Sequence, residues 1–416
     1  MSNHPLERRV FSISGSFAKG NPYPDYAWFR EHDPISFGEP DWPQGKPAVS
    51  LFRFRDVHDV LRHPQAGVEG WKLSAEVRDP NEPAPEPTPY GSVARNFMLF
   101  NDPPNHTRLR RIANMAFTPR QVAKLRPEVE SIADYLIADM QDASAPVDLV
   151  RDYCYPLPVL VIGKILGVPE VDLPKFRYWA SVLAAAIDFE FEELSDLNNN
   201  RDAATMELYQ YLSDLMKARR ANPQDDLISQ MVQAETDEGR MSHEELVATA
   251  ILLLFAGHET TTNLIGNGTF VMMRHRDQWQ TLVDQPELAP TAVEELLRYE
   301  SPVQLTTRVA MDDIELSGET IPRGSQMMIF LGSANRDPAV FDDPERLDIT
   351  REVKRTMAFG MGIHFCLGSP LARLEGEVAF AKLVQAAPGL ELVNDEPKWR
   401  PGAVLHGLRE LPVTLG

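Results

Sequence analysis

Residues 359–368 read FGMGIHFCLG, a pattern F-G-x-G-x-H-x-C-x-G that surrounds a single cysteine with glycines. The stretch 371–383 that follows is predicted to be helical, so Cys366 is expected near a helix N-terminus. Unpaired backbone N–H groups and the positive end of the helix dipole favour a thiolate there. Gly360 permits a tight turn, and Gly368 leaves room for a flat cofactor to approach the backbone. A lone thiolate on such a loop suits axial ligation of haem iron.

The composition limits the kind of partner that the chain can have. Its 416 residues include 41 Lys and Arg against 61 Asp and Glu, a formal net charge of −20, which argues against binding to nucleic acid or anionic membrane. The two cysteines, Cys154 and Cys366, supply neither a disulfide framework nor a Cys-x-x-Cys metal site. No apolar run near the N-terminus is long enough for a signal peptide or membrane anchor. We therefore expect a soluble cytoplasmic protein.

A second motif lies inside the longest predicted helix, residues 242–273. Ser242 and Glu245 form a Ser-x-x-Glu capping box, which predicts the first turn of this helix. The middle of the helix reads Ala-Gly-His-Glu-Thr-Thr-Thr, and glycine and threonine are poor helix formers. The Thr260 hydroxyl is expected to bond back to the carbonyl of Ala256 and to bend the helix. A groove is therefore expected at this point.

Together the two motifs resemble those of the cytochromes P450, and further motifs match in order from about residue 20 to 414. The resemblance implies a mainly α fold with a small β region, a triangular helical prism in which haem lies between the long helix and the cysteine loop. It implies one domain over residues 1–416, although length alone suggests two or three. The implied cofactor is haem b, with Cys366 as the iron ligand.

The resemblance also assigns roles to individual residues. Glu259 is the acid and Thr260 the alcohol of the family's oxygen-handling motif. His106 and Arg110, four apart on one helical face, match positions that bind a haem propionate. The full set of cofactor-binding residues implied in this way is His106, Arg110, Ala256, Arg308, Phe359, Gly360, His364, Cys366 and Gly368.

Substrate and bracing residues follow from the same resemblance. Substrate contacts are expected from Leu252, Phe255, Val303, Gln304 and Leu305, a mostly apolar set that fits a lipid, terpenoid, steroid or polyketide. The proline-rich segment 80–89 corresponds to part of the substrate entrance, and 405–413 resembles a closing hairpin whose tip touches substrate. Glu295 and Arg298 form an i,i+3 ion pair, which Arg346 is expected to join behind the haem loop.

A basic segment stands out in this acidic chain. Between Pro103 and Pro127 there is no Asp or Glu, although the segment contains Arg108, Arg110, Arg111, Arg120, Lys124 and Arg126. Most of these side chains are expected in solvent. Those not used by haem indicate a docking surface for an acidic redox partner, with Arg108 and Arg111 as the best candidates.

The implied activity is insertion of one oxygen atom from O₂ into a hydrophobic small molecule, by hydroxylation or epoxidation. Electrons would come from a separate ferredoxin with its reductase or from a flavodoxin, because the chain ends about fifty residues after Cys366. A monomer is expected. Two other classes stay open, a peroxide-driven peroxygenase and a non-catalytic haem protein that binds a ligand. The Glu259–Thr260 pair argues against both. The sequence leaves the substrate, the position of attack and the natural electron donor open.

Overall fold

The chain folds mainly into α-helices, and the strands of its described parts form four small sheets. The computed structural model describes residues 11–17, 20–38, 47–77, 86–114, 117–142, 146–184, 194–234 and 241–416. Most of the proline-rich segment 80–89 therefore lies outside the described residues. The predicted fold class, mainly α with a small β region, is confirmed.

The helices are α1 Ile13–Phe17, α2 Tyr23–His32, α3 Phe54–Leu61, α4 Trp71–Val77, α5 Pro89–Ala94, α6 Asn105–Asn114, α7 Pro119–Ala123, α8 Arg126–Asp142, α9 Pro156–Leu166, α10 Leu173–Ala184, α11 Leu194–Ala221, α12 Leu227–Gln233, α13 His243–Arg274, α14 Arg276–Asp284, α15 Ala289–Tyr299, α16 Leu331–Ala334 and α17 Ser369–Ala386. The strands are β1 Ile35–Phe37, β2 Val49–Leu51, β3 Ala66–Gly67, β4 Val147–Asp148, β5 Leu305–Ala310, β6 Ile314–Leu316, β7 Glu319–Ile321, β8 Gln326–Phe330, β9 Glu391–Leu392, β10 Lys398–Trp399, β11 Leu408–Glu410 and β12 Pro412–Thr414.

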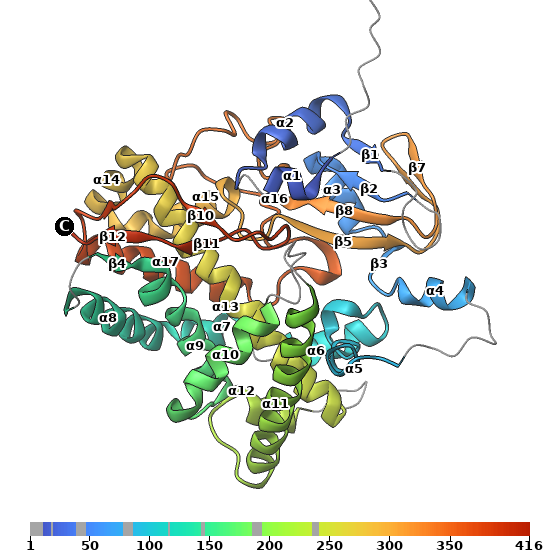
Figure 1. Cartoon of the computed structure of the whole chain (residues 1–416), viewed down its shortest axis with the longest axis horizontal. Helices are drawn as coiled ribbons and strands as arrows, with labels where there is room; N and C mark the ends of the chain where they lie inside the picture. Colours follow the sequence, from blue (N-terminus) through green and yellow to red (C-terminus); the bar gives the residue numbers. More distant parts are fainter. Residues whose placement is uncertain are drawn as a thin grey trace, which may run out of the picture.

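The long helix α13 crosses the middle of the molecule (Figure 1). The predicted capping box is present, since Ser242 accepts from the backbone N–H of Glu245 and the Glu245 side chain accepts from the backbone N–H of Ser242. Helices α9, α10, α11 and α17 pack against it. A helix buried on nearly every side belongs to the core, which explains why apolar residues occupy so many of its positions. Among the described helices, none combines the length and apolar character that crossing a bilayer requires.

The largest sheet lies beside the first helices of the chain (Figure 1). Its strand order is β1-β2-β8-β5-β3, with β2 and β8 parallel and the other neighbours antiparallel. Strand β5 carries Arg308 toward the cavity described below.

The closing hairpin predicted at 405–413 is wrong in its bounds. Strand β11 pairs antiparallel with the preceding strand β10, so the turn lies between Trp399 and Leu408. Strand β12 leaves for another sheet, where it pairs with β4 and β9. Because the two strands of the predicted hairpin bind different partners, they do not pair with each other. None of the residues 398–413 lines the cavity that contains Cys366.

Candidate functional site

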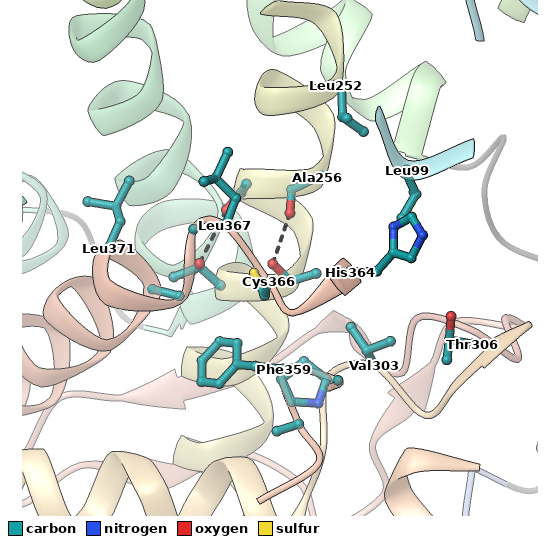
Figure 2. A pocket seen from close by; sticks show the side chains of 18 of the residues that line it. Leu99, Leu252, Ala256, Val303, Thr306, Phe359, His364, Cys366, Leu367 and Leu371 are labelled. Carbon is teal, nitrogen blue, oxygen red and sulfur yellow. Dashed lines mark hydrogen bonds between the residues drawn. The ribbon is translucent and has the colours of Figure 1, made fainter. Parts of the chain in front are cut away.

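The cysteine loop is a tight structure that ends at α17. Gly360 and Gly362 have φ of +66° and +73°, a left-handed conformation that glycine adopts without strain. A Cβ on Gly362 would lie 2.3 Å from the carbonyl oxygen of Leu61, so no other residue fits there. The backbone N–H of Cys366 donates to the carbonyl of Phe359 over 2.9 Å and closes the loop. Figure 2 shows Cys366 with Ala256 of α13 above it.

Opposing effects act on the Cys366 thiol. Burial raises its pKa, whereas the backbone N–H groups of Gly368 and Ser369 and the cations Arg110 and Arg373 lower it. The N–H groups at the start of α17 therefore favour the thiolate, as the sequence predicted, and burial opposes them. Coordination to a metal ion would deprotonate the thiol in spite of this burial.

A cavity of about 300 Å³ lies between the cysteine loop, α13 and β5. All nine predicted cofactor-binding residues line it: His106, Arg110, Ala256, Arg308, Phe359, Gly360, His364, Cys366 and Gly368. Of the predicted catalytic and substrate residues, Thr260, Leu252 and Val303 line it as well. The sequence therefore identified residues from five separate elements that meet at one place.

One side of the cavity is strongly electropositive. The rings of His106 and His364 lie 4.3 Å apart, and the Nε2 atom of each is buried without a hydrogen-bond partner. Burial lowers the pKa of Arg308 to about 10, and burial together with Arg308, His106 and Arg110 lowers the pKa of His364 to about 3. Such a cluster is costly unless an anion binds between these groups.

The residues present fit haem b. The carboxyl group that lines the cavity, Glu375, does not compensate the cations, because burial raises its pKa to about 8 and leaves it mostly neutral near pH 7. Two haem propionates would supply the missing negative charge and accept from His106, Arg110, Arg308 and His364. Cys366 would supply the sulfur ligand.

The middle of α13 shows the threonine bonding that the sequence predicted. The Thr260 hydroxyl donates to the carbonyl of Ala256 over 3.1 Å, and Thr261 and Thr262 donate in the same way to the carbonyls four residues earlier. The helix nonetheless continues without a break to Arg274. The groove arises from the small residues Ala256 and Gly257, which line the cavity beside Thr260.

Glu259 is buried beside the cavity rather than in it. Its side chain is only 4% exposed and does not line the cavity. Arg400, which follows β10, donates to Glu259 Oε1. The His258 Nε2 atom lies 3.4 Å from Glu259 Oε2. Burial raises the pKa of Glu259, but His258 and Arg400 outweigh this effect and lower it below its usual value.

Three predicted substrate residues do not reach the cavity. Phe255 is rotated by one helical position from Ala256 and packs on Phe97, with ring centroids 5.5 Å apart. Leu305 points to the opposite face of β5 from Thr306 and is fully buried. Gln304 is also fully buried, and its amide donates to the carbonyl of Ser301 and to the Tyr23 hydroxyl.

The bracing cluster contains a different arginine from the predicted one. Arg298 donates twice to Glu295, and both side chains are fully buried. The second cation is Arg351, whose Nε lies 3.1 Å from Glu295 Oε1. Arg346 contributes only its backbone carbonyl to Arg298, and its side chain is 65% exposed. The prediction for the Arg346 side chain is therefore wrong.

Sequence reasoning missed Glu375, Arg351 and Arg400. Glu375 had a detectable signal, because helical spacing places it on the buried face of α17 with Leu371 and Val378. The two arginines had none, because they meet their partners across 56 and 141 residues of sequence.

Comparisons with known proteins agree with this geometry. A family model described as Cytochrome P450 matches residues 194–284 and 278–387. Vitamin D(3) 25-hydroxylase of Pseudonocardia autotrophica is 41% identical, covering 97% of this chain and 96% of that protein. 6-Deoxyerythronolide B hydroxylase of Saccharopolyspora erythraea is 41% identical over 77% of this chain and 79% of that protein. The structure of the Bacillus subtilis 168 bacillaene synthase cytochrome P450 PksS matches with a TM-score of 0.88 at 36% identity, covering 98% of this chain and 100% of that one.

Proposed function

This chain belongs to the bacterial cytochrome P450 family and is a haem b monooxygenase of small molecules; we propose that Cys366 is its thiolate ligand and that Glu259 and Thr260 deliver protons during catalysis. The observation that carries this proposal is the convergence of nine residues on one cavity that has cations at one side and a lone cysteine at its base. Bound haem supplies the iron chemistry that activates O₂ and oxidises the substrate.

The chain's own residues hold the cofactor and manage protons. His106, Arg110, Arg308 and His364 present N–H donors to the propionates, which would otherwise be buried without counter-ions. Thr260 presents its hydroxyl to the cavity, so it can orient and donate to a reacting oxygen atom or a water molecule. Glu259 faces away from the cavity, so its protons reach Thr260 through water.

The remaining lining favours an apolar substrate. The part of the cavity next to α13 is bordered by Met98, Leu99, Leu252, Leu253 and Val303. Thr306 adds a hydroxyl at the edge of this apolar surface. The proposed substrate is therefore a largely apolar ring compound of the steroid or polyketide kind, a class that includes the molecules named for the two hydroxylase relatives.

The family requires an electron donor, and an acidic ferredoxin or flavodoxin fits the basic segment best. Arg110 Nη2 donates to the carbonyl of Phe365 over 2.5 Å, which fixes α6 against the cysteine loop. The exposed side chains of Arg111, Arg120 and Lys124 lie on α6, on α7 and at its end. Exposed Ile363 and Phe365 project from the loop itself. An apolar patch beside cations suits a weak, charge-steered redox encounter.

Product formation with different oxidants tests the proposed function. The haem-loaded protein is screened with steroids and macrolide precursors for a Soret shift that reports displacement of the haem water. Each hit is then incubated with a ferredoxin, its reductase and NAD(P)H, with hydrogen peroxide, or with neither. The proposal predicts oxygenated product mainly with the ferredoxin system. Product with peroxide only would indicate a peroxygenase, and a Soret shift without product in any incubation would indicate a ligand-binding protein.

A further inference from the structure

His258 is a buried titratable side chain in the middle of α13 that the proposed function does not use. Its side chain is 0% exposed. The Nδ1 atom lies 3.1 Å from the carbonyl oxygen of Leu254, and the Nε2 atom has no hydrogen-bond partner. The ring packs edge-on against Tyr155, with centroids 5.4 Å apart. A packed core histidine would normally have both nitrogens satisfied, so the Nε2 atom needs an explanation.

The contact with Leu254 determines which nitrogen carries a proton. A carbonyl oxygen only accepts hydrogen bonds, so Nδ1 must be the donor. In the neutral ring the Nε2 atom is then an acceptor. It faces Glu259 Oε2 at 3.4 Å, which is an acceptor as well when the carboxylate is ionised. Two buried acceptors at this separation are satisfied only when one proton lies between them.

We propose that His258 is a positioning residue for the proton relay, which holds a proton on Nε2 and transfers it to Glu259. This inference rests on the proposed role of Glu259 and names the group from which Glu259 is recharged. Arg400 fixes the other carboxylate oxygen, Oε1, so that Oε2 stays directed at His258. The three side chains therefore form a His–Glu–Arg row next to the oxygen-handling part of the helix, buried at His258 and Glu259 and partly exposed at Arg400.

The transfer balances without any further reagent. The Nε2–H bond of the imidazolium breaks, an O–H bond forms on Glu259 Oε2, and the neutral ring keeps its Nδ1–H bond to Leu254. Glu259 then releases this proton toward the cavity through water. A proton from solvent then restores the imidazolium. Arg400 is the partly exposed member of the row, at 33%.

Four charged or titratable side chains lie near the His258 ring. Glu259 on the same helix lies 3.4 Å from the ring, and Arg400 after β10 binds the far side of that carboxylate. Tyr155 at the start of α9 packs edge-on against His258, and its hydroxyl donates to the carbonyl of Arg177 on α10. The guanidinium of Arg177 lies 4.6 Å from the centre of the Tyr155 ring, so it is a second nearby cation.

Substitution of His258 by glutamine tests the inference, because glutamine fills similar space but does not accept and release a proton near neutral pH. We expect His258→Gln to lower ferredoxin-supported turnover by about tenfold, the scale at which partners of a functional group commonly act. The solvent deuterium isotope effect on turnover should increase, and the dependence of turnover on pH between 5 and 8 should flatten. The CO spectrum and the substrate-induced Soret shift should stay unchanged. A merely structural role for His258 would not alter the isotope effect.

His275, the residue that caps the C-terminal end of α13, provides a matched control. Its Nδ1 atom lies 2.9 Å from the carbonyl oxygen of Val271, the same backbone contact four residues back. His275→Gln should therefore leave turnover and the isotope effect at wild-type values. Wild-type turnover and isotope effect in a folded, haem-loaded His258→Gln protein would overturn the inference.

Glu259→Gln and the double variant separate this inference from the proposed function. If Glu259→Gln turns over at the wild-type rate, the role of Glu259 in the proposed function fails, and the inference fails with it. If Glu259→Gln is slow but His258→Gln is normal, only the inference fails. The inference predicts that His258→Gln combined with Glu259→Gln is no slower than Glu259→Gln alone, because both residues act in one path. Additive losses would contradict it.

Discussion

Arg351 Nε lies 3.1 Å from Oε1 of Glu295, a fully buried carboxylate that also accepts two hydrogen bonds from Arg298. The backbone N–H of Asp348 donates to the same oxygen. The cluster therefore joins α15 to the segment after β8 that leads into the cysteine loop. Removing one of the two arginines leaves the buried Glu295 carboxylate with less positive charge beside it.

Arg351→Ala should destabilise the protein by about 2 kcal/mol, because a charge-assisted hydrogen bond to a buried group is lost. Arg346→Ala should change stability by less than about 0.5 kcal/mol, because that side chain is exposed. Urea unfolding of the two haem-loaded variants checks this difference. A larger loss for Arg346→Ala than for Arg351→Ala would contradict the assignment of Arg351 to the cluster.

Glu375 makes stability depend on pH in a defined direction. Its pKa is raised to about 8 by burial, above the value of about 4.3 expected in the unfolded chain. A raised folded pKa means that the unfolded state loses its proton first as pH increases. The stabilising contribution is thus complete below pH 4 and is lost progressively up to about pH 8, with a slope of at most about 1.4 kcal/mol per pH unit.

Glu375→Gln should remove this pH dependence, because the amide stays neutral in both states. The variant should unfold at nearly the wild-type temperature at pH 5 and at a higher temperature than wild type at pH 8. Glu377→Gln, which alters a partly exposed residue on the same helix that pairs with Arg126, is the control and should shift Tm equally at both pH values. Equal shifts for Glu375→Gln would show that this carboxyl is not buried in the neutral form.

Arg108 and Arg111 were predicted together as docking residues, but the structure separates them. Arg108 makes a bidentate ion pair with Glu245 at the start of α13, whereas Arg111 is exposed on α6. Arg111→Glu should slow ferredoxin-supported reduction several-fold at low salt, and the difference from wild type should shrink as ionic strength rises. Arg108→Gln should instead lower stability. Reduction rates of wild type that do not change with salt would count against charge steering.

Thr260 lines the cavity beside Ala256 and Gly257, so removal of its hydroxyl should misdirect protons and leave binding intact. Thr260→Ala should consume NAD(P)H with a coupling to product at least about tenfold below wild type, since positioned proton donors are worth about 10²–10⁴-fold. Hydrogen peroxide should account for the lost electrons. Thr262→Ala is the control, because its hydroxyl is buried against the His258 carbonyl and does not line the cavity. Full coupling in Thr260→Ala would remove Thr260 from the relay.

The sequence predicted the features that depend on local spacing. The cysteine loop, the capping box of α13 and the Thr260–Ala256 bond each lie within ten residues, so their geometry follows from backbone rules. The errors arose where a contact depends on how a side chain is rotated about its helix axis, or on a partner far away in the sequence. Phe255 was assigned to the wrong side of α13 because adjacent helical positions are about 100° apart, and spacing alone did not define the cavity-facing side.

Long-range partners and desolvation were not predictable. Arg400 reaches Glu259 from a hairpin at the far end of the chain, and no local pattern links them. The N–H groups that favour a Cys366 thiolate were predictable because the helix N-terminus is visible in the sequence, whereas the burial that opposes them depends on the complete fold. In both cases the sequence indicated the functional residue, Glu259 or Cys366, but not the groups that surround it in the fold.

The CO spectrum of the reduced protein tests the central claim, that Cys366 is the thiolate ligand of the haem. Wild-type protein should show the red-shifted Soret band that gives the family its name. Cys366→Ser should lose this band, whereas Cys154→Ser, which alters a fully buried cysteine on another element, should keep it. A folded, haem-loaded Cys366→Ser protein that retains the red-shifted band would contradict the account.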